Sequence, residues 1–219
     1  MPTAPKKHAP TDFLRLPPGG VVSCTEGWLP AEQAAAIYKE LLESLDWRQL
    51  PVYLFGRWIP QPRLTDFHGD PGTRYRYAGL DLHGRGWPAA LDVLRESVVL
   101  HTGERFNTVL CNLYRDGNDY MGWHADDERE LGRDPIIASI SLGASRRFLL
   151  RPARGRRGER HEFVLASGSL LLMAGDLQHH WQHQLPKALR VDQPRINLTF
   201  RRVSGRASDG VSGRRDGLL

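Results

Sequence analysis

The segment GWHADDERE, residues 122–130, concentrates side chains that can bind a metal ion. His124 and Asp126 are separated by one residue, so in an extended strand both side chains point to the same face of a sheet. With a second histidine from a distant strand, they would form the facial triad that leaves three positions open on octahedral iron(II). A structural zinc site is disfavoured, because the chain contains only two cysteines. A charged surface turn is the alternative interpretation.

A later segment, LQHHWQHQLP, offers the second histidine. If this segment is extended, His179 and His183 share a face with Trp181, whereas His180 points to the other face. Spacing alone therefore leaves both His179 and His183 open as the third ligand. A His-x-Asp pattern occurs often by chance, so the metal site needs support from other residues.

Polar residues alternate with apolar ones in two strand-like segments. In PRINLTFRRV four polar side chains fall on one face: Arg195, Asn197, Thr199 and Arg201. Such a face usually points to solvent, but a small barrel that binds a dicarboxylate needs a fixed cation inside, and a guanidinium can bind a carboxylate through two hydrogen bonds. In NTVLCNLY, Asn112 and Tyr114 share a face and can donate hydrogen bonds to the same acid.

Helices and short strands must position these residues. The segments 30–47 and 87–103 place apolar residues at helical spacing, which predicts two amphipathic helices. Residues 53–80 have little periodicity and are expected to form surface loops and hairpins. After Phe106 six strand-sized segments follow, at 107–114, 136–143, 146–151, 161–167, 169–175 and 195–203. The expected fold is mainly β within an α+β class, an antiparallel sandwich or barrel fronted by the helices.

Composition limits the function classes. The 219 residues favour a single packed domain, and no apolar run approaches the length of a membrane span. No secretory signal, glycine-rich phosphate loop or serine nucleophile elbow is present. Cys24 and Cys111 are expected to be reduced, which indicates a cytosolic or nuclear compartment.

The chain is basic, with a formal net charge of +5. Seven arginines between residues 145 and 160 face a single acid, Glu159. Arginines in a glycine-punctuated loop suit forked contacts to phosphate oxygens, so this loop is a candidate nucleic-acid contact. A solvated loop that keeps the protein soluble is the alternative.

Taken together, NLYRDGNDYMGWHADDERE, HWQHQLP and PRINLTFR resemble the motifs of the AlkB family of nucleic-acid demethylases, in order and at suitable separations. The resemblance extends from about Val52 to Val203. It implies a double-stranded β-helix (jelly-roll) core and a dioxygenase that uses iron(II), 2-oxoglutarate and O2. It implies His124, Asp126 and His183 as iron ligands. It also implies roles in 2-oxoglutarate binding, at the distal carboxylate for Arg195 with Tyr114 and Asn197, and at the other end for Asn112 and Arg201.

The resemblance further implies a nucleotide-recognition lid in TRYRYAGL, where Tyr77 would stack on a base with Tyr75 on the same face. Packing of one or both tyrosines against the second helix is the alternative. YLFGRW resembles the finger hairpin of the duplex-preferring members, with Phe55 as the wedge. Glu128 would read an exocyclic amine at the pocket mouth. The remaining expected nucleic-acid contacts are arginines: Arg57, Arg63, Arg146, Arg156 and Arg157.

The expected organisation is a disordered arm (1–12), helical support and lid (13–104), a dioxygenase core (105–203) and a disordered tail (204–219). The expected function is oxidative removal of methyl groups from N1 of adenine and N3 of cytosine in DNA, in a duplex with a flipped base. A relative acting on RNA or single strands, a catalytically silent nucleic-acid-binding barrel and a protein hydroxylase are the alternatives. We expect a monomer located in the cytoplasm, on the nucleoid in a bacterium, or in the nucleus of a eukaryote.

Overall fold

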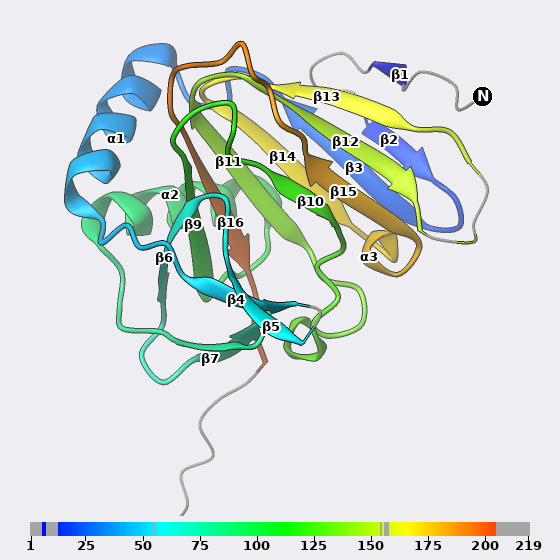
Figure 1. Cartoon of the computed structure of the whole chain (residues 1–219), viewed down its shortest axis with the longest axis horizontal. Helices are drawn as coiled ribbons and strands as arrows, with labels where there is room; N and C mark the ends of the chain where they lie inside the picture. The colour runs from blue at the N-terminus through cyan, green and yellow to red at the C-terminus, as the bar shows by residue number, and fades with distance from the viewer. Residues whose placement is uncertain (1–5, 8–12, 55, 154, 156–157, 205–219) are drawn as a thin grey trace, which may run out of the picture.

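The computed structural model describes residues 6–7, 13–54, 56–153, 155 and 158–204. Two β-sheets form the centre of the structure (Figure 1). The seven-stranded sheet has the order β2 (Phe13–Leu16), β3 (Gly20–Thr25), β14 (Ser169–Ala174), β11 (Ile137–Gly143), β16 (Arg195–Arg201), β9 (Thr108–Tyr114) and β6 (Leu64–Gly69). The five-stranded sheet has the order β1 (Lys6–Lys7), β13 (His161–Leu165), β12 (Arg146–Pro152), β15 (Trp181–Leu185) and β10 (Met121–His124).

The two sheets face each other across an apolar cluster. Phe148 and Leu150 of β12 and Phe163 of β13 pack with Leu171 and Met173 of β14 in this cluster. All strand pairs within the sheets are antiparallel except that of β1 with β13. The mainly β jelly-roll core that the sequence predicts is therefore confirmed.

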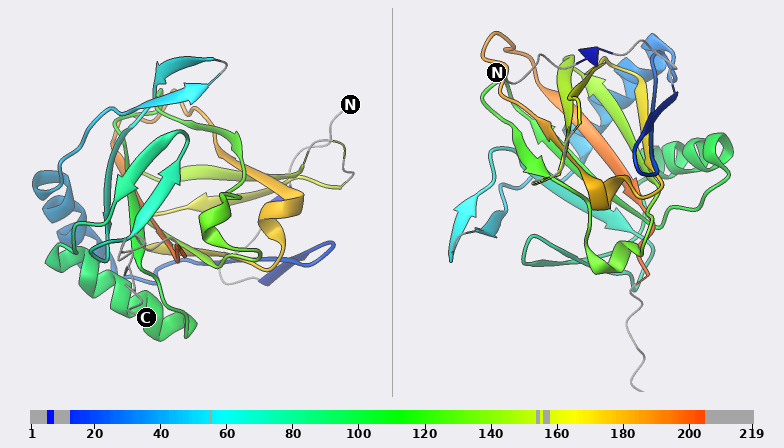
Figure 2. Two further views of the ribbon diagram at one scale, coloured as in Figure 1. Left: turned by 90° about the horizontal axis from the view of Figure 1, so that it is seen from below. Right: turned by 90° about the vertical axis from the view of Figure 1, so that its right-hand side faces the viewer.

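Two helices cover the outer face of the seven-stranded sheet, as the sequence predicts (Figures 1 and 2). They are α1 (Ala31–Ser44) and α2 (Ala89–Thr102), and α2 is capped by Gly103, which adopts the left-handed conformation favoured by glycine. Leu41 of α1 and Leu91 of α2 belong to the same buried cluster as Leu198 of β16. No helix among the described residues has the length and apolarity needed to cross a membrane.

The central strand β16 shows why its polar face points inward. Its apolar residues Ile196, Leu198 and Phe200 pack in the cluster under the helices. The alternate residues of the strand, which include Arg195 and Arg201, therefore face the space between the two sheets. The helices thus take the apolar face of β16 and leave its polar face for binding.

The region between the helices differs in part from the prediction. Two hairpins form there, β4 (Pro51–Leu54) with β5 (Arg57–Pro60) and β7 (Arg74–Tyr77) with β8 (Leu80–His83). The expectation that the whole region lies on the surface is wrong, because β6 is a largely buried strand that pairs with β9. Its polar Asp66 is accommodated by hydrogen bonds from the backbone N–H groups of Asp46 and Phe67.

Residues before the predicted core also join the main sheet. Strands β2 and β3 form a hairpin that pairs with β14, so the seven-stranded sheet contains segments from both sides of residue 105. The expected arm and tail lie largely outside the described residues, apart from β1 and Ser204. The two hairpins outside the main sheets, β4–β5 and β7–β8, lie at the same end of the molecule (Figure 2).

Candidate metal centre and cosubstrate pocket

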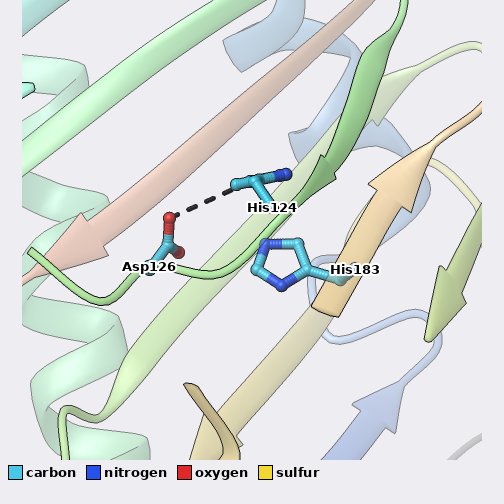
Figure 3. A group of neighbouring side chains, drawn as sticks. All are labelled: His124, Asp126 and His183. Atoms are coloured by element: carbon cyan, nitrogen blue, oxygen red, sulfur yellow. Dashed lines mark ion pairs between the residues drawn. The ribbon is translucent and has the colours of Figure 1, made fainter. Parts of the chain in front are cut away.

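Three side chains from neighbouring segments converge between the sheets. His124 ends β10, Asp126 follows it, and His183 lies in the middle of β15, directly opposite His124 in the strand register. One potential ligand atom from each side chain lies within 4.8 Å of the others (Figure 3). The structure thus brings together the three residues that the sequence proposed as metal ligands.

His179, the other histidine that spacing left open, lies elsewhere. Residues 177–180 form a short helix, α3 (Leu177–His180), so the segment is not extended where His179 occurs. The His179 ring contacts the carbonyl oxygen of Arg133 and the carboxylate of Asp134. The helical turn separates His179 from His183 and removes the assumption on which the spacing argument rested.

Hydrogen bonds hold the candidate ligands in place. Arg201 donates from Nη2 to Oδ1 of Asp126 at 2.9 Å, and the backbone N–H of Asp126 donates to Oε1 of Gln178 at 2.9 Å. Nδ1 of His124 lies 2.8 Å from the carbonyl oxygen of Gly122. Because a carbonyl only accepts, Nδ1 carries the proton and Nε2 keeps its lone pair for a metal ion.

The protonation states suit metal binding. Burial raises the pKa of Asp126, but Arg201 and the two imidazoles outweigh this effect and bring the pKa to about 2. Burial lowers the pKa of His183 to about 3 and also lowers the pKa of His124. Two neutral imidazoles and one carboxylate are the donor set of the iron(II) facial triad, so these residues fit that ion.

Arg195 provides a fixed cation in the same pocket. Its side chain is only 2% exposed, and it lies opposite Tyr114 of β9 in the strand register. Nη2 donates to Oγ of Ser141 at 2.8 Å, and the guanidinium lies 5.4 Å from the centre of the Tyr114 ring. Burial lowers the pKa of Arg195 to about 10, a value at which the group is still charged at neutral pH.

The surroundings of Arg195 fit a dicarboxylate. Among the described residues Arg195 forms no ion pair, and its buried Nε has no hydrogen-bond partner. A buried cation without a counter-ion is costly. A ligand carboxylate would satisfy both the charge and the free donor, as expected for the distal carboxylate of 2-oxoglutarate.

The other predicted cosubstrate residues line the same pocket. Asn197 donates from Nδ2 to Oγ of Ser139 at 2.7 Å, and Nδ2 of Asn112 donates to Oδ1 of Asn197 at 3.4 Å. Arg201 lies at the metal end through its bond to Asp126. The pocket is lined, among others, by Asn112, Tyr114, His124, Asp126, His183, Arg195, Asn197 and Arg201.

The lid tyrosines are both buried on one face of β7, with ring centroids 5.9 Å apart. Tyr77 lines the pocket, whereas Tyr75 packs behind it against Phe67 and below the guanidinium of Arg201. Glu128 is half-buried, and burial followed by the charge of Asp126 raises its pKa to about 7.

Two arginines expected to contact nucleic acid, Arg63 and Arg146, are buried and do not lie on the exposed surface. Arg63 is 3% exposed, and its guanidinium points into the pocket. Arg146 faces the space between the sheets because it shares the buried face of β12 with Phe148 and Leu150. Its guanidinium donates to carbonyl oxygens of Asp116, Asp119 and Pro186.

The remaining residues predicted to contact nucleic acid are either exposed or not among the described residues. Arg57 is exposed on β5. Phe55, Arg156 and Arg157 lie outside the described residues.

Sequence reasoning missed several residues that shape the pocket. Ser139 and Ser141 of β11 receive hydrogen bonds from Asn197 and Arg195, and Gln178 positions Asp126. The alternation in ASISLG was a usable signal, because its serines lie on the same side of the strand. The role of Gln178 depends on the turn at α3 and left no such pattern.

Comparisons with known proteins agree with this site. Residues 21–201 match the 2OG-Fe(II) oxygenase superfamily. The chain is 42% identical over 180 residues to "DNA oxidative demethylase ALKBH2" of Mus musculus, covering 78% of this chain and 75% of that protein. It is 38% identical over 200 residues to "Alpha-ketoglutarate-dependent dioxygenase alkB homolog 3" of Homo sapiens, covering 87% of this chain and 69% of that protein.

The fold is also similar to a solved one. "The structure of OsALKBH1" superposes with a TM-score of 0.60 and 17% sequence identity, covering 87% of this chain and 100% of the other. At that identity the match speaks for the fold alone. From the family match and these relatives, the chain belongs to the 2OG-Fe(II) oxygenase superfamily and, within it, to the AlkB family of 2-oxoglutarate-dependent dioxygenases.

Proposed function

We propose that this protein removes methyl groups from ring nitrogens of DNA bases, such as N1 of adenine and N3 of cytosine. The products are the unmodified base, formaldehyde, succinate and CO2. The observation that carries the proposal is one pocket that combines the His124, Asp126 and His183 group, the unpaired cation of Arg195 and the wall formed by Tyr77. The relatives named as demethylases support the same reaction.

Each part of the pocket has a role in this reaction. Bound iron(II), with 2-oxoglutarate and O2, supplies the oxidising power that hydroxylates the N-methyl carbon while 2-oxoglutarate is converted to succinate and CO2. Arg195 holds the distal carboxylate of the cosubstrate and so fixes its orientation. Arg201 keeps Asp126 ionised and directed at the metal position. The hydroxymethyl product then loses formaldehyde, which restores the ring nitrogen.

The substrate base must leave its stack to reach this pocket, because the metal position lies between the sheets. Tyr77 offers the wall against which the flipped base would stack. Exposed aromatic residues on the β4–β5 hairpin also suit contact with bases: Tyr53 is 52% and Trp58 is 53% exposed, with ring centroids 5.3 Å apart. Arg57 on the same hairpin suits contact with phosphate.

A methylated base of this kind is a cation, so an acidic side chain near the pocket would favour its binding. Glu128 lies two residues after Asp126 on the same segment and is half-buried. Its carboxylate suits recognition of an exocyclic amine at the pocket mouth.

The direct test is product formation from an oligonucleotide that carries one N1-methyladenine, with iron(II) and 2-oxoglutarate supplied. We expect formaldehyde and succinate in equal amounts. Replacement of His183 by glutamine should abolish both products, whereas replacement of the exposed Arg105 should preserve them. Absence of both products from methylated DNA and RNA, despite bound metal and 2-oxoglutarate, would reject the proposal.

A second candidate is action on RNA or single-stranded DNA, which the exposed aromatic pair of the β4–β5 hairpin also suits. The discriminating residue is Phe55, proposed from sequence as the wedge that fills the gap left in a duplex. Phe55→Ala should reduce activity on a duplex more than on a single strand of the same sequence. An equal loss on both substrates would favour the single-strand candidate.

A further inference from the structure

Arg63 connects two parts of the pocket that belong to different substructures. It lies between β5 and β6, and the next residues of β6 pair with β9 so that Thr65 is opposite Asn112. This register places Arg63 beside the wall that holds the cosubstrate residues. Its Nε donates to Oδ1 of Asn112 at 2.8 Å, and its Nη2 donates to the hydroxyl of Tyr77 at 2.9 Å.

The hydrogen bonds continue from Asn112 along the pocket wall. Nδ2 of Asn112 donates to Oδ1 of Asn197, and Nδ2 of Asn197 donates to Oγ of Ser139. A buried chain of hydrogen bonds therefore runs from the hydroxyl of Tyr77 to residues beside Arg195 in the same pocket.

Burial of the Arg63 charge costs free energy that a neutral residue in a purely structural link would not cost. Its side chain is 3% exposed, and among the described residues it forms no ion pair. Neutral amide and hydroxyl partners offset only part of the cost of burying a charge. A neutral residue would pack at lower cost, so the guanidinium is better explained by its two-sided contact.

The two ends of this link differ in how firmly they are held. Asn112 lies in the middle of the seven-stranded sheet, between β16 and β6. Tyr77 lies on the β7–β8 hairpin, which belongs to neither of the two large sheets. The bond from Arg63 is therefore a tie between a separate hairpin and the fixed wall of the cosubstrate pocket.

We propose that Arg63 is a positioning residue that couples 2-oxoglutarate binding to nucleic-acid binding. The cosubstrate contacts Asn112 and Asn197, and Arg63 carries this contact to the Tyr77 ring, which it holds in the orientation that receives the flipped base. This inference rests on the proposed function, in which Tyr77 stacks on the base. By linkage, each ligand then tightens the binding of the other by the same factor.

The test measures this coupling without turnover. The full-length protein is loaded with Mn(II) in the absence of O2, and the dissociation constant of a single-stranded oligonucleotide with one N1-methyladenine is measured by fluorescence anisotropy with and without 2-oxoglutarate. We expect the wild type to bind the oligonucleotide about fivefold or more tightly with 2-oxoglutarate. The reciprocal change should appear when 2-oxoglutarate binding is measured by calorimetry.

Two variants separate coupling from folding. Arg63→Met removes both bonds, and Tyr77→Phe removes only the hydroxyl while keeping the aromatic ring. Both should bring the coupling factor close to one, whereas Arg15→Met, at an exposed position on β2, should keep the wild-type factor. Thermal unfolding of each variant shows whether it is folded. If Arg63→Met does not fold, Tyr77→Phe decides the question.

The outcomes distinguish this inference from the proposed function. A wild-type protein that releases formaldehyde but shows no coupling overturns the inference alone. Folded variants that keep the wild-type coupling factor overturn it as well. A wild-type protein that binds metal and 2-oxoglutarate but releases no formaldehyde from methylated nucleic acid overturns the proposed function instead.

Discussion

Because Arg195 has no counter-ion among the described residues, its replacement by methionine should strongly weaken 2-oxoglutarate binding but change the stability of the ligand-free protein little. In Arg195→Met the side chain keeps a similar length but loses its charge and its bond to Ser141. Truncation of one partner in a buried, hydrogen-bonded charge pair costs about 2–5 kcal/mol of binding free energy. The dissociation constant of 2-oxoglutarate should therefore rise by about 30-fold to about 5,000-fold.

The stability of the ligand-free protein should respond differently. The variant loses one hydrogen bond, worth about 1 kcal/mol, but it no longer buries a cation that lacks a counter-ion among the described residues. We therefore expect the free energy of unfolding to change by no more than about 1 kcal/mol in either direction. This behaviour would separate a ligand anchor from a structural arginine.

Calorimetric titration of the Mn(II)-loaded protein with 2-oxoglutarate measures the first quantity, and urea denaturation of the metal-free protein measures the second. Arg105→Met, at an exposed position, is the matched control and should change neither. Unchanged 2-oxoglutarate affinity in Arg195→Met would refute the assignment of the anchor. A collapse of stability together with the affinity would show that Arg195 is needed for the fold.

Three further predictions concern the metal position and the buried charges around it. Asp126→Asn should abolish metal binding and also lower the metal-free unfolding free energy by about 3–5 kcal/mol, because Arg201 loses its buried partner, as urea denaturation would show. Arg146→Met should destabilise the protein by several kcal/mol, since it holds three loop carbonyls, yet leave the salt dependence of DNA binding unchanged; a shallower salt slope would contradict its burial. Burial raises the pKa of Asp119, but bonds from Arg115 outweigh this and leave that pKa below its ordinary value. The ionised Asp119 therefore stabilises the fold above about pH 4. The loss of unfolding free energy caused by Asp119→Asn should shrink as the pH falls from 7 through the lowered pKa. A difference in denaturation midpoint between wild type and variant that does not change with pH would contradict this.

Periodicity in the sequence was enough to predict the helices and most of the core strands. The segments 30–47 and 87–103 contain α1 and α2, and the alternation in PRINLTFRRV separates the helix-facing residues of β16 from the pocket residues. These predictions succeed because local spacing determines which side chains share a face, and burial of the apolar face fixes which side packs inward.

Strand β6, Arg63 and Arg146 are buried although the sequence suggests exposed positions, and the three cases have the same physical cause. Residues 53–80, which contain β6, show little periodicity and therefore suggest surface loops. Arg63 suggests a nucleic-acid contact because it lies near the predicted finger hairpin, and Arg146 because it belongs to the arginine-rich segment. In each case the buried polar group forms a hydrogen bond with a residue from another part of the chain. Asp66 bonds with Asp46, Arg63 with Asn112, and Arg146 with Asp116. Composition alone does not reveal such partners.

The third metal ligand illustrates the same limit. Alternation could not separate His179 from His183, because the segment begins as the helical turn α3 and becomes extended only at Trp181. The resemblance to a known family favours His183, and the register opposite His124 places that side chain beside the other two candidate ligands. A tertiary pairing of strands therefore supplied what spacing could not.

A crystal structure with Mn(II) and 2-oxoglutarate, in which anomalous scattering locates the metal, would test the metal site and the cosubstrate anchor together. We expect the metal within coordination distance of His124, Asp126 and His183, and the distal carboxylate of 2-oxoglutarate paired with Arg195. A metal bound elsewhere, or a cosubstrate whose distal carboxylate pairs with Arg63 instead of Arg195, would contradict this expectation.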